Sequence, residues 1–374
     1  MSATPNEETE RLPVAPYLAV GLSTVVHGVG SRRDIEGNLD TLEDAIHAAM
    51  GIISINMPVK LIAFAEGALT GFTDEAFDVP HVTAARELFI DIPGEESDRL
   101  ARLARMYQTY LVVQCKARWP EVMPDRYFNT LFVISPRGQV VHKAAKNHVW
   151  CRERSCTPHD VYDRWVELFG DGIDAFYPVL RTDDIGALGT ICCSDGEYPE
   201  AIRALAFNGA EVVYRPSEAV PMTNVGYPGG GTWLLQNRAH AHFNNVYVIA
   251  PNVGPVYLHP KMKHPFDIGG GQSHIVDYMG NVLSYSPSGY NTFVSAIIDI
   301  EALRQFRWLE QEPASHAEVD DVYRDNIRRL LERGSFTPPA HEFEGARFYP
   351  MDPDLSPAEA WKQAKELWEE PPDT

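Results

Sequence analysis

The sequence has no long hydrophobic run and no excess of basic residues. Its 374 residues include 32 lysines and arginines against 52 aspartates and glutamates, which gives a formal net charge of -20. No stretch approaches the roughly 20 apolar residues that a membrane span needs. The acidity argues against nucleic acids and anionic membranes as partners, and it makes a neutral small molecule a better ligand than an anion.

The sequence has few cysteines, and their number is odd. The five cysteines, Cys115, Cys151, Cys156, Cys192 and Cys193, form no paired framework, and an odd number suits a reducing compartment. The first residues, MSATPNEETERLP, lack the basic and then apolar pattern of a secretory signal. We therefore expect a cytoplasmic protein with reduced thiols.

The patterns that would indicate a metal or a cofactor are incomplete. Cys151 and Cys156 lie near His148 and His159, but no second pair has the spacing of a zinc site. The glycine-rich segments lack the spacing of a dinucleotide or phosphate loop. We expect no metal and no cofactor.

The chain alternates between strand-like and helix-like segments. Short apolar runs at 17–25, 59–66 and 110–115 predict strands. Apolar residues spaced by three or four at 38–50 and 96–108 predict helices. Alternation of this kind predicts α/β architecture, with sheets covered by helices.

Although the length alone suggests two or three domains, the continuous alternation predicts one. We place this domain at residues 15–300, after an N-terminal tail at 1–14 and before a C-terminal extension at 301–374. Trp361 and Trp368 lie seven residues apart on one face of a predicted helix in the extension. They need an apolar partner, which is either the same chain or a neighbouring subunit that the extension wraps.

The most informative segment is ICCSDGEYPE, which starts at Ile191. The apolar run at 186–193 predicts a buried strand, and Pro199 predicts the start of a helix because its missing N–H costs nothing there. Cys193 would therefore lie at a strand-to-helix turn, where a helix N-terminus favours the thiolate. Strand alternation predicts that Cys193 and Ile191 share one face and that Cys192 lies on the other.

Two charged residues also follow predicted strands. Glu66 ends the run LIAFAE, and Lys146 follows a hairpin that turns at 136–138. An acid, an amine and a thiol supply the proton shuttle, the oxyanion partner and the nucleophile that amide cleavage needs. Taken singly, Glu66 and Lys146 could be ordinary surface charges, and Cys193 could be an ordinary core residue. Lys143 is the alternative to Lys146 as the functional lysine.

The order of these residues resembles the carbon-nitrogen hydrolase (nitrilase) superfamily, whose catalytic triad is Glu-Lys-Cys. The cysteine motif of the family is matched by Cys193, Asp195, Tyr198, Pro199 and Glu200. The resemblance implies Glu66 as general acid and base, Lys146 as oxyanion partner and Cys193 as nucleophile. It also implies a four-layer αββα sandwich with the triad at one sheet edge.

The segment SDGEYPE is similar to the amidase branch of that superfamily, in which a second glutamate follows a Trp-Cys pair. Glu153 is the candidate here, one residue short of the usual spacing, and its alternative role is an ion pair with a neighbouring arginine. Trp150 is either a pocket wall or a core residue, and the backbone N–H near Ser194 is a second oxyanion donor. Short-chain amidases usually have a larger residue where this chain has Gly67, so we expect room for a bigger acyl group.

The resemblance leads to a specific functional expectation. We expect hydrolysis of a small neutral carboxamide to a carboxylate and ammonia through a cysteine thioester, in a homo-oligomer built from dimers. The alternatives are a nitrilase, an N-carbamoyl amidohydrolase, or a non-catalytic protein that retains the scaffold.

Overall fold

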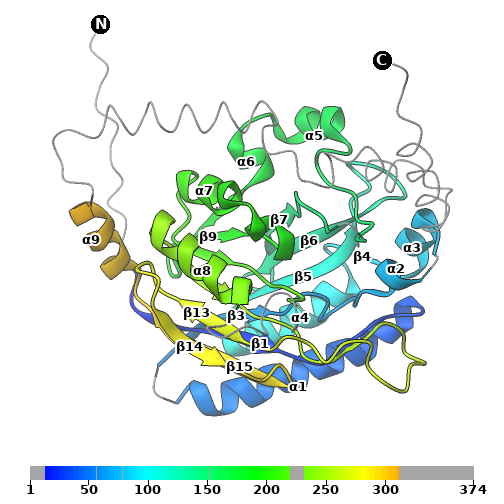
Figure 1. Cartoon of the computed structure of the whole chain (residues 1–374), viewed down its shortest axis with the longest axis horizontal. Helices are drawn as coiled ribbons and strands as arrows, with labels where there is room; N and C mark the ends of the chain where they lie inside the picture. Colours follow the sequence, from blue (N-terminus) through cyan, green and yellow to red (C-terminus); the bar gives the residue numbers. More distant parts are fainter. Residues whose placement is uncertain (1–12, 56, 78, 151, 220–230, 311–374) are drawn as a thin grey trace, which may run out of the picture.

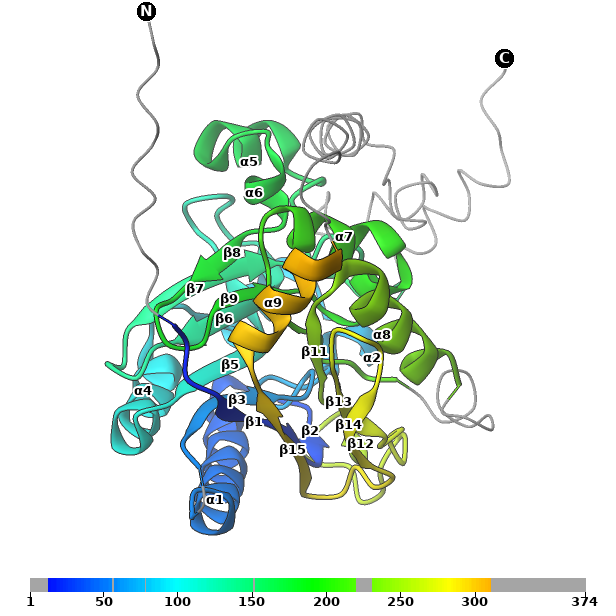
Figure 2. The same ribbon diagram turned by 90° about the vertical axis from the view of Figure 1, so that its left-hand side faces the viewer.

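The computed structural model describes residues 13–55, 57–77, 79–150, 152–219 and 231–310. Two β-sheets face each other, and helices cover the two outer faces (Figure 1). Figure 2 shows α1 and α4 on one outer side and α7 and α8 on the other. The expected αββα sandwich is therefore confirmed.

The first sheet has the strand order β15-β1-β3-β5-β6-β7, with β4 paired to β5. Its strands are β1 (Tyr17–Ser23), β3 (Val59–Phe64), β4 (Ile90–Asp91), β5 (Tyr110–Arg118), β6 (Tyr127–Ile134), β7 (Val140–Ala145) and β15 (Thr292–Ile298). Helices α1 (Ile35–Ile53) and α4 (Glu95–Tyr107) lie on its outer face, and their Leu42, Ile46 and Leu100 pack there in one buried cluster. The apolar spacing of both helices thus corresponds to the face that each one buries.

The second sheet has the order β14-β13-β11-β10-β9-β8. Its strands are β8 (Val179–Arg181), β9 (Ala187–Thr190), β10 (Val212–Tyr214), β11 (Tyr247–Ala250), β13 (Ser273–Val276) and β14 (Val282–Ser286). Helices α7 (Pro199–Phe207) and α8 (Gly231–Asn244) cover it through Ile202, Leu205 and Trp233. As predicted, Pro199 is the first residue of its helix.

The inner faces of the sheets pack directly on each other. Ala63 and Val112 of the first sheet share a buried cluster with Leu188 and Ile249 of the second. In the first sheet β3 is parallel to β5, and two antiparallel steps through β6 lead to β7, so β3 and β7 run in the same direction. Residues that follow β3 and β7 therefore meet at one edge of the sandwich.

The remaining described elements are short or lie at the periphery. They are β2 (Val26–His27), η1 (Arg32–Asp34), α2 (Thr73–Ala76), α3 (His81–Glu87), α5 (Tyr162–Phe169), α6 (Ile173–Phe176), η2 (Cys193–Glu197), β12 (Val256–Tyr257) and α9 (Ile300–Glu310). Ile300 and Leu303 of α9 belong to the cluster between the sheets, so the first turn of the predicted extension packs on the domain. Trp361 and Trp368 lie outside the described residues. Among the helices described, none is long and apolar enough to cross a membrane.

Candidate active site

Glu66 is buried two residues beyond the end of β3, with a residue exposure of only 3%. Its Oε2 accepts the main-chain N–H of Glu218 at 2.9 Å, and its Oε1 accepts the Asn129 amide at 3.2 Å. The next residue, Gly67, has a φ of 69° and donates its N–H to Gln114 Oε1 at 2.7 Å. The chain therefore turns sharply at the strand end, and the carboxylate is fixed by donors from other strands and loops.

The structure shows no open space beside Gly67. A Cβ at this position would lie 2.5 Å from the Phe72 ring, so that ring fills the space a larger residue would need. The expectation that Gly67 makes room for a bigger acyl group is wrong. Glycine is required here by the left-handed φ and by the close approach of Phe72.

Lys146 follows β7 directly and lies between two carboxylates. Its Nζ is 2.6 Å from Glu153 Oε2 and 3.5 Å from Glu66 Oε1. The Asn129 amide donates to Glu153 Oε1 at 2.8 Å as well as to Glu66, so it links the two acids. Lys143, the alternative lysine, pairs instead with Glu121 at 3.1 Å.

Lys146 and Glu153 each stabilise the charged form of the other. Burial acts to lower the pKa of Lys146, but Glu153 and Glu66 together hold it well above its usual value. Burial acts to raise the pKa of Glu153, but the charges of Lys146 and Lys116, with hydrogen bonds from Lys146 and Asn129, lower it below its usual value. Both groups are therefore charged at neutral pH.

The cysteine segment leaves the sheet at the end of β9 and turns at Cys193. Cys192 has an extended φ of -127°, whereas Cys193 has a φ of 46°. Both cysteines pack against the cluster between the sheets, and Ile191 lies in the outer cluster under α7. The prediction that Cys193 shares a face with Ile191 is wrong, because the positive φ interrupts the strand alternation.

The two thiols differ in exposure and in partners. Cys192 is fully buried, and its Sγ donates to Glu66 Oε1 at 3.1 Å. Cys193 is partly exposed, which a nucleophile requires. Burial and the charge of Glu66 raise the pKa of Cys193, against the opposing effects of Lys146 and a Ser217 hydrogen bond. Cys193 therefore rests as a thiol close to a carboxylate and an ammonium group.

Asp195 joins the cysteine turn to the loop that follows Lys146. Its carboxylate accepts the N–H of His148 at 2.7 Å and the N–H of Cys192 at 3.0 Å. The Ser194 hydroxyl donates to the carbonyl of His148, so this side chain has a structural partner. The motif identified Asp195 from the sequence, but its bridging role needed the structure.

Trp150 lies at the edge of this loop rather than in the core. Half of the residue, 50%, is exposed, and its main-chain N–H donates to Glu153 Oε2 at 3.4 Å. The Arg152 guanidinium lies 5.8 Å from the centre of its ring. The core interpretation is therefore wrong, and the role of pocket wall remains a prediction.

Sequence reasoning missed a second buried lysine beside this group. Lys116 is fully buried, and its Nζ lies 2.6 Å from Asp74 Oδ1 and 2.6 Å from Glu75 Oε1. Burial raises the pKa of Glu75 to about 7, although Lys116 opposes the shift. A lysine inside an apolar strand, in the run LVVQCKA, was the available signal.

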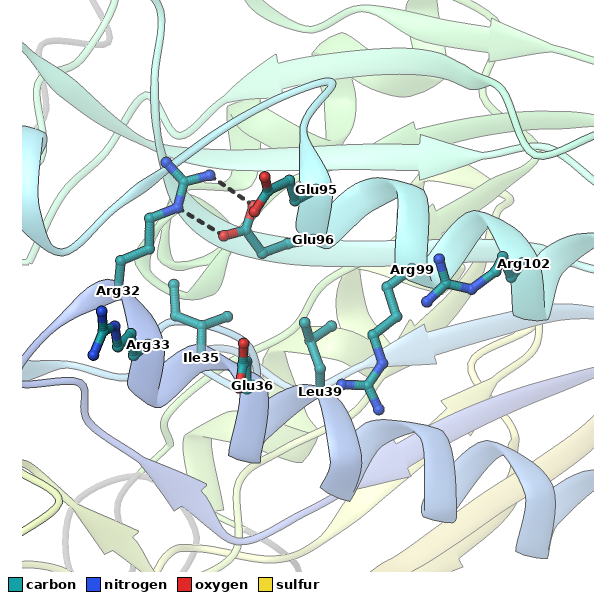
Figure 3. Close-up of a pocket in the computed structure, with 9 residues that line it drawn as sticks. All are labelled: Arg32, Arg33, Ile35, Glu36, Leu39, Glu95, Glu96, Arg99 and Arg102. Atoms are coloured by element: carbon teal, nitrogen blue, oxygen red, sulfur yellow. Dashed lines mark hydrogen bonds and ion pairs between the residues drawn. The ribbon is translucent and has the colours of Figure 1, made fainter.

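The described residues offer no metal site, because they contain no group of three or more histidine, cysteine or acidic side chains that could hold an ion. A separate charged groove lies on the outer helical layer, between the start of α1 and α4 (Figure 3). Its lining is Arg32, Arg33, Ile35, Glu36, Leu39, Glu95, Glu96, Arg99 and Arg102. None of the predicted site residues lines it.

The sequence is similar to those of known amide-cleaving enzymes. The chain is 26% identical over 242 residues to formamidases from Helicobacter acinonychis and Bacillus cereus, a region that covers 64% of this chain. The chain spans 63% of the length of these relatives.

Solved structures of nitrilase-superfamily proteins share the fold. Saccharomyces cerevisiae Nit3 is 19% identical with a TM-score of 0.56, covering 80% of this chain and 97% of that one. A carbon-nitrogen hydrolase from Helicobacter pylori G27 is 21% identical with a TM-score of 0.57, covering 82% and 98%. An amidase from Nesterenkonia sp. is 17% identical with a TM-score of 0.53, covering 77% and 92%.

The sequence model of the carbon-nitrogen hydrolase family matches residues 20–307. This range contains both sheets, apart from the first three residues of β1, and all the strand-end residues described above. The protein therefore belongs to the carbon-nitrogen hydrolase family, within the nitrilase superfamily.

Proposed function

We propose that this protein hydrolyses the C–N bond of a small carboxamide, releasing ammonia and a carboxylate through a thioester on Cys193. The observation that carries the proposal is the buried Lys146 ammonium held between Glu66 and Glu153, beside the cysteine turn. The relatives named formamidase and amidase support an amide as the substrate.

In the first half of the reaction, Glu66 takes the proton of the Cys193 thiol and the sulfur attacks the amide carbonyl. The carbonyl oxygen becomes an oxyanion, which Lys146 stabilises by its charge. When the C–N bond breaks, Glu66 returns the proton to the nitrogen, and ammonia leaves.

In the second half, Glu66 takes a proton from water, and the resulting hydroxide attacks the thioester carbon. The C–S bond breaks, the sulfur regains its proton and the carboxylate leaves. Glu153 keeps Lys146 charged through both halves, because it holds the ammonium at 2.6 Å. The thiol at rest requires a base within reach, and Glu66 meets that requirement.

The charges near the site support an uncharged carboxamide over an anionic one. Burial, Glu75 and Glu66 together raise the pKa of Glu218, whose N–H binds Glu66. An anionic substrate would meet the same acidic surroundings that resist ionisation of Glu218. We therefore propose a small neutral carboxamide.

The test measures ammonia release from an amide panel together with the intact mass of the protein during turnover. We expect an acyl adduct on Cys193, loss of the adduct and of turnover in Cys193→Ala, and turnover within about tenfold of wild type in Cys192→Ala. An adduct on Cys192, or turnover by Cys193→Ala, would contradict the proposal. Release of ammonia from nitriles or from ureido compounds alone would favour the two alternative activities.

We also propose a homo-oligomer built from dimers in a reducing, cytoplasmic setting. Leu235 and Phe243 on α8 are 64% and 68% exposed, which supports an interface on that helical layer. The four described cysteines are free, which supports a reducing compartment. Light scattering of the full chain and of a chain ending at residue 340 tests both the oligomer and the contribution of the extension.

A further inference from the structure

The backbone of the cysteine turn is held by the segment that follows β10. The Arg215 Nε and Nη2 atoms both donate to the carbonyl oxygen of Cys193, at 3.1 and 2.9 Å. The Cys193 N–H donates to the carbonyl of Pro216 at 2.8 Å. Both main-chain groups of the residue with the left-handed φ are therefore fixed by two consecutive residues.

Arg215 is itself firmly placed in the second sheet and its helical cover. Its Nη1 donates to Asn237 Oδ1 at 2.8 Å and its Nη2 to Gln236 Oε1 at 2.9 Å, both on α8. The guanidinium lies 4.8 Å from the centre of the Trp233 ring. Burial lowers the pKa of Arg215 to about 10, so it stays charged at neutral pH.

A glycine makes this approach possible. A Cβ at Gly196 would lie 2.1 Å from the Arg215 Nε, so the buried guanidinium would have to move away from its present partners. The described hydrogen bonds of Arg215 all go to neutral oxygens, those of Cys193, Asn237 and Gln236. A buried charge whose hydrogen bonds go to neutral groups polarises those groups, here chiefly the Cys193 carbonyl, which accepts two of the bonds.

The contact between Arg215 and the Cys193 carbonyl also orients the N–H of the same peptide group, which belongs to Ser194. The Cys193–Ser194 peptide is trans and planar, so the Ser194 N–H points away from the carbonyl that Arg215 binds. Ser194 is in the first turn of η2, where N–H groups lack an acceptor within the helix. Outside η2, no main-chain carbonyl of the described residues accepts a hydrogen bond from this N–H.

From these contacts we infer that Arg215 is a positioning residue that aims and polarises the Ser194 N–H as the second oxyanion donor, opposite Lys146. Arg215 holds the carbonyl toward α8, and the N–H is thereby directed toward the side between the sheets, where Glu66 lies. The inference rests on the proposed amide hydrolysis, because an oxyanion donor acts only if an oxyanion forms.

The experiment compares turnover with a reaction that forms no oxyanion. Alkylation of Cys193 by iodoacetamide displaces iodide at a saturated carbon, so it reports on the thiol alone. We expect Arg215→Met to lower kcat by about tenfold to a hundredfold, less than the roughly 10²–10³ for a direct donor, with KM and the alkylation rate within about threefold of wild type. The matched control is Arg238→Met, since Arg238 also lies on α8 and donates to a carbonyl, that of Gly280 at 2.9 Å.

A second variant tests the same contact if Arg215→Met does not fold. Gly196→Ala keeps the charge but displaces the guanidinium, and we expect the same selective loss of kcat. If both variants fold, the double variant should be no slower than Arg215→Met, because the two changes remove one contact.

An unchanged kcat in the folded variants would overturn the inference. So would equal losses of kcat and of alkylation, since these would show a displaced thiol. A wild-type protein that releases no ammonia from any amide would instead overturn the proposed function, and this inference with it.

Discussion

Two regions of the molecule bring positive and negative side chains to the same distance. Lys146 lies 2.6 Å from Glu153 at the strand ends, and Arg99 lies 2.6 Å from Asp40 beside the groove of Figure 3. The side chains of the first pair are 1% and 2% exposed, whereas those of the second are 25% and 67% exposed. Contact distance therefore does not distinguish the regions, and burial does.

Burial changes what each pair contributes. Water and ions screen the groove pairs, whose expected value is about 0.2–1 kcal/mol each. The buried pair has lost its hydration, so either partner alone is strongly unfavourable and the charges stay fixed in place. A site that must stabilise a developing oxyanion needs the second kind of environment.

The largest expected effect comes from Lys146→Met. We expect a loss of turnover of at least about 10²–10³-fold and a drop of about 3–5 kcal/mol in the free energy of unfolding, because Glu153 is left buried and unpaired. Ammonia release and urea unfolding measure the two effects. Lys143→Met is the control, and equal effects of the two variants would remove the distinction drawn here.

Glu153→Gln should have a smaller effect on stability. The amide keeps the shape and leaves Lys146 paired with Glu66, so we expect a loss of about 1.5–3 kcal/mol. A double-mutant cycle with Lys146→Met should give a coupling free energy above about 1 kcal/mol. The same cycle for Arg99 and Glu43, which are also 2.6 Å apart, should give less than about 0.5 kcal/mol.

Glu75→Gln should change how stability depends on pH. Burial raises the pKa of Glu75 from 4.5 to about 7, so between these values the folded protein holds a proton that the unfolded chain has released. The free energy of unfolding should therefore fall as pH rises from 4.5 to about 7, by on the order of 1–3 kcal/mol. The variant should remove this fall, as urea unfolding at several pH values would show. An identical slope in both proteins would contradict the assignment.

The smallest effect is expected at the groove. Arg99→Ala should lower the free energy of unfolding by less than about 1 kcal/mol, less still in 0.5 M salt, and should leave kcat unchanged. A large effect that persists in salt would show that the groove pairs behave like the buried ones.

Local patterns in the sequence predicted the elements that carry the site. Apolar runs placed β3 and β7, and Pro199 marked the start of α7, so Glu66 and Lys146 were correctly expected beyond strand ends. The patterns failed where a neighbour distant in the sequence decides the geometry. The Phe72 ring fills the space beside Gly67, and the positive φ of Cys193 is held by Arg215 and Pro216.

Periodicity along the chain fixed the α/β class and the strand-end positions, because both follow from side-chain spacing within a single segment. Which charges became buried partners depended on packing, since Glu66, Lys146 and the cysteine turn come from three different strands. Lys116 shows the same limit, because its position in a strand does not reveal that Asp74 and Glu75 lie within reach. Contacts of this kind arise only when sheets and loops close around them, and that closure sets their desolvation and therefore their charge.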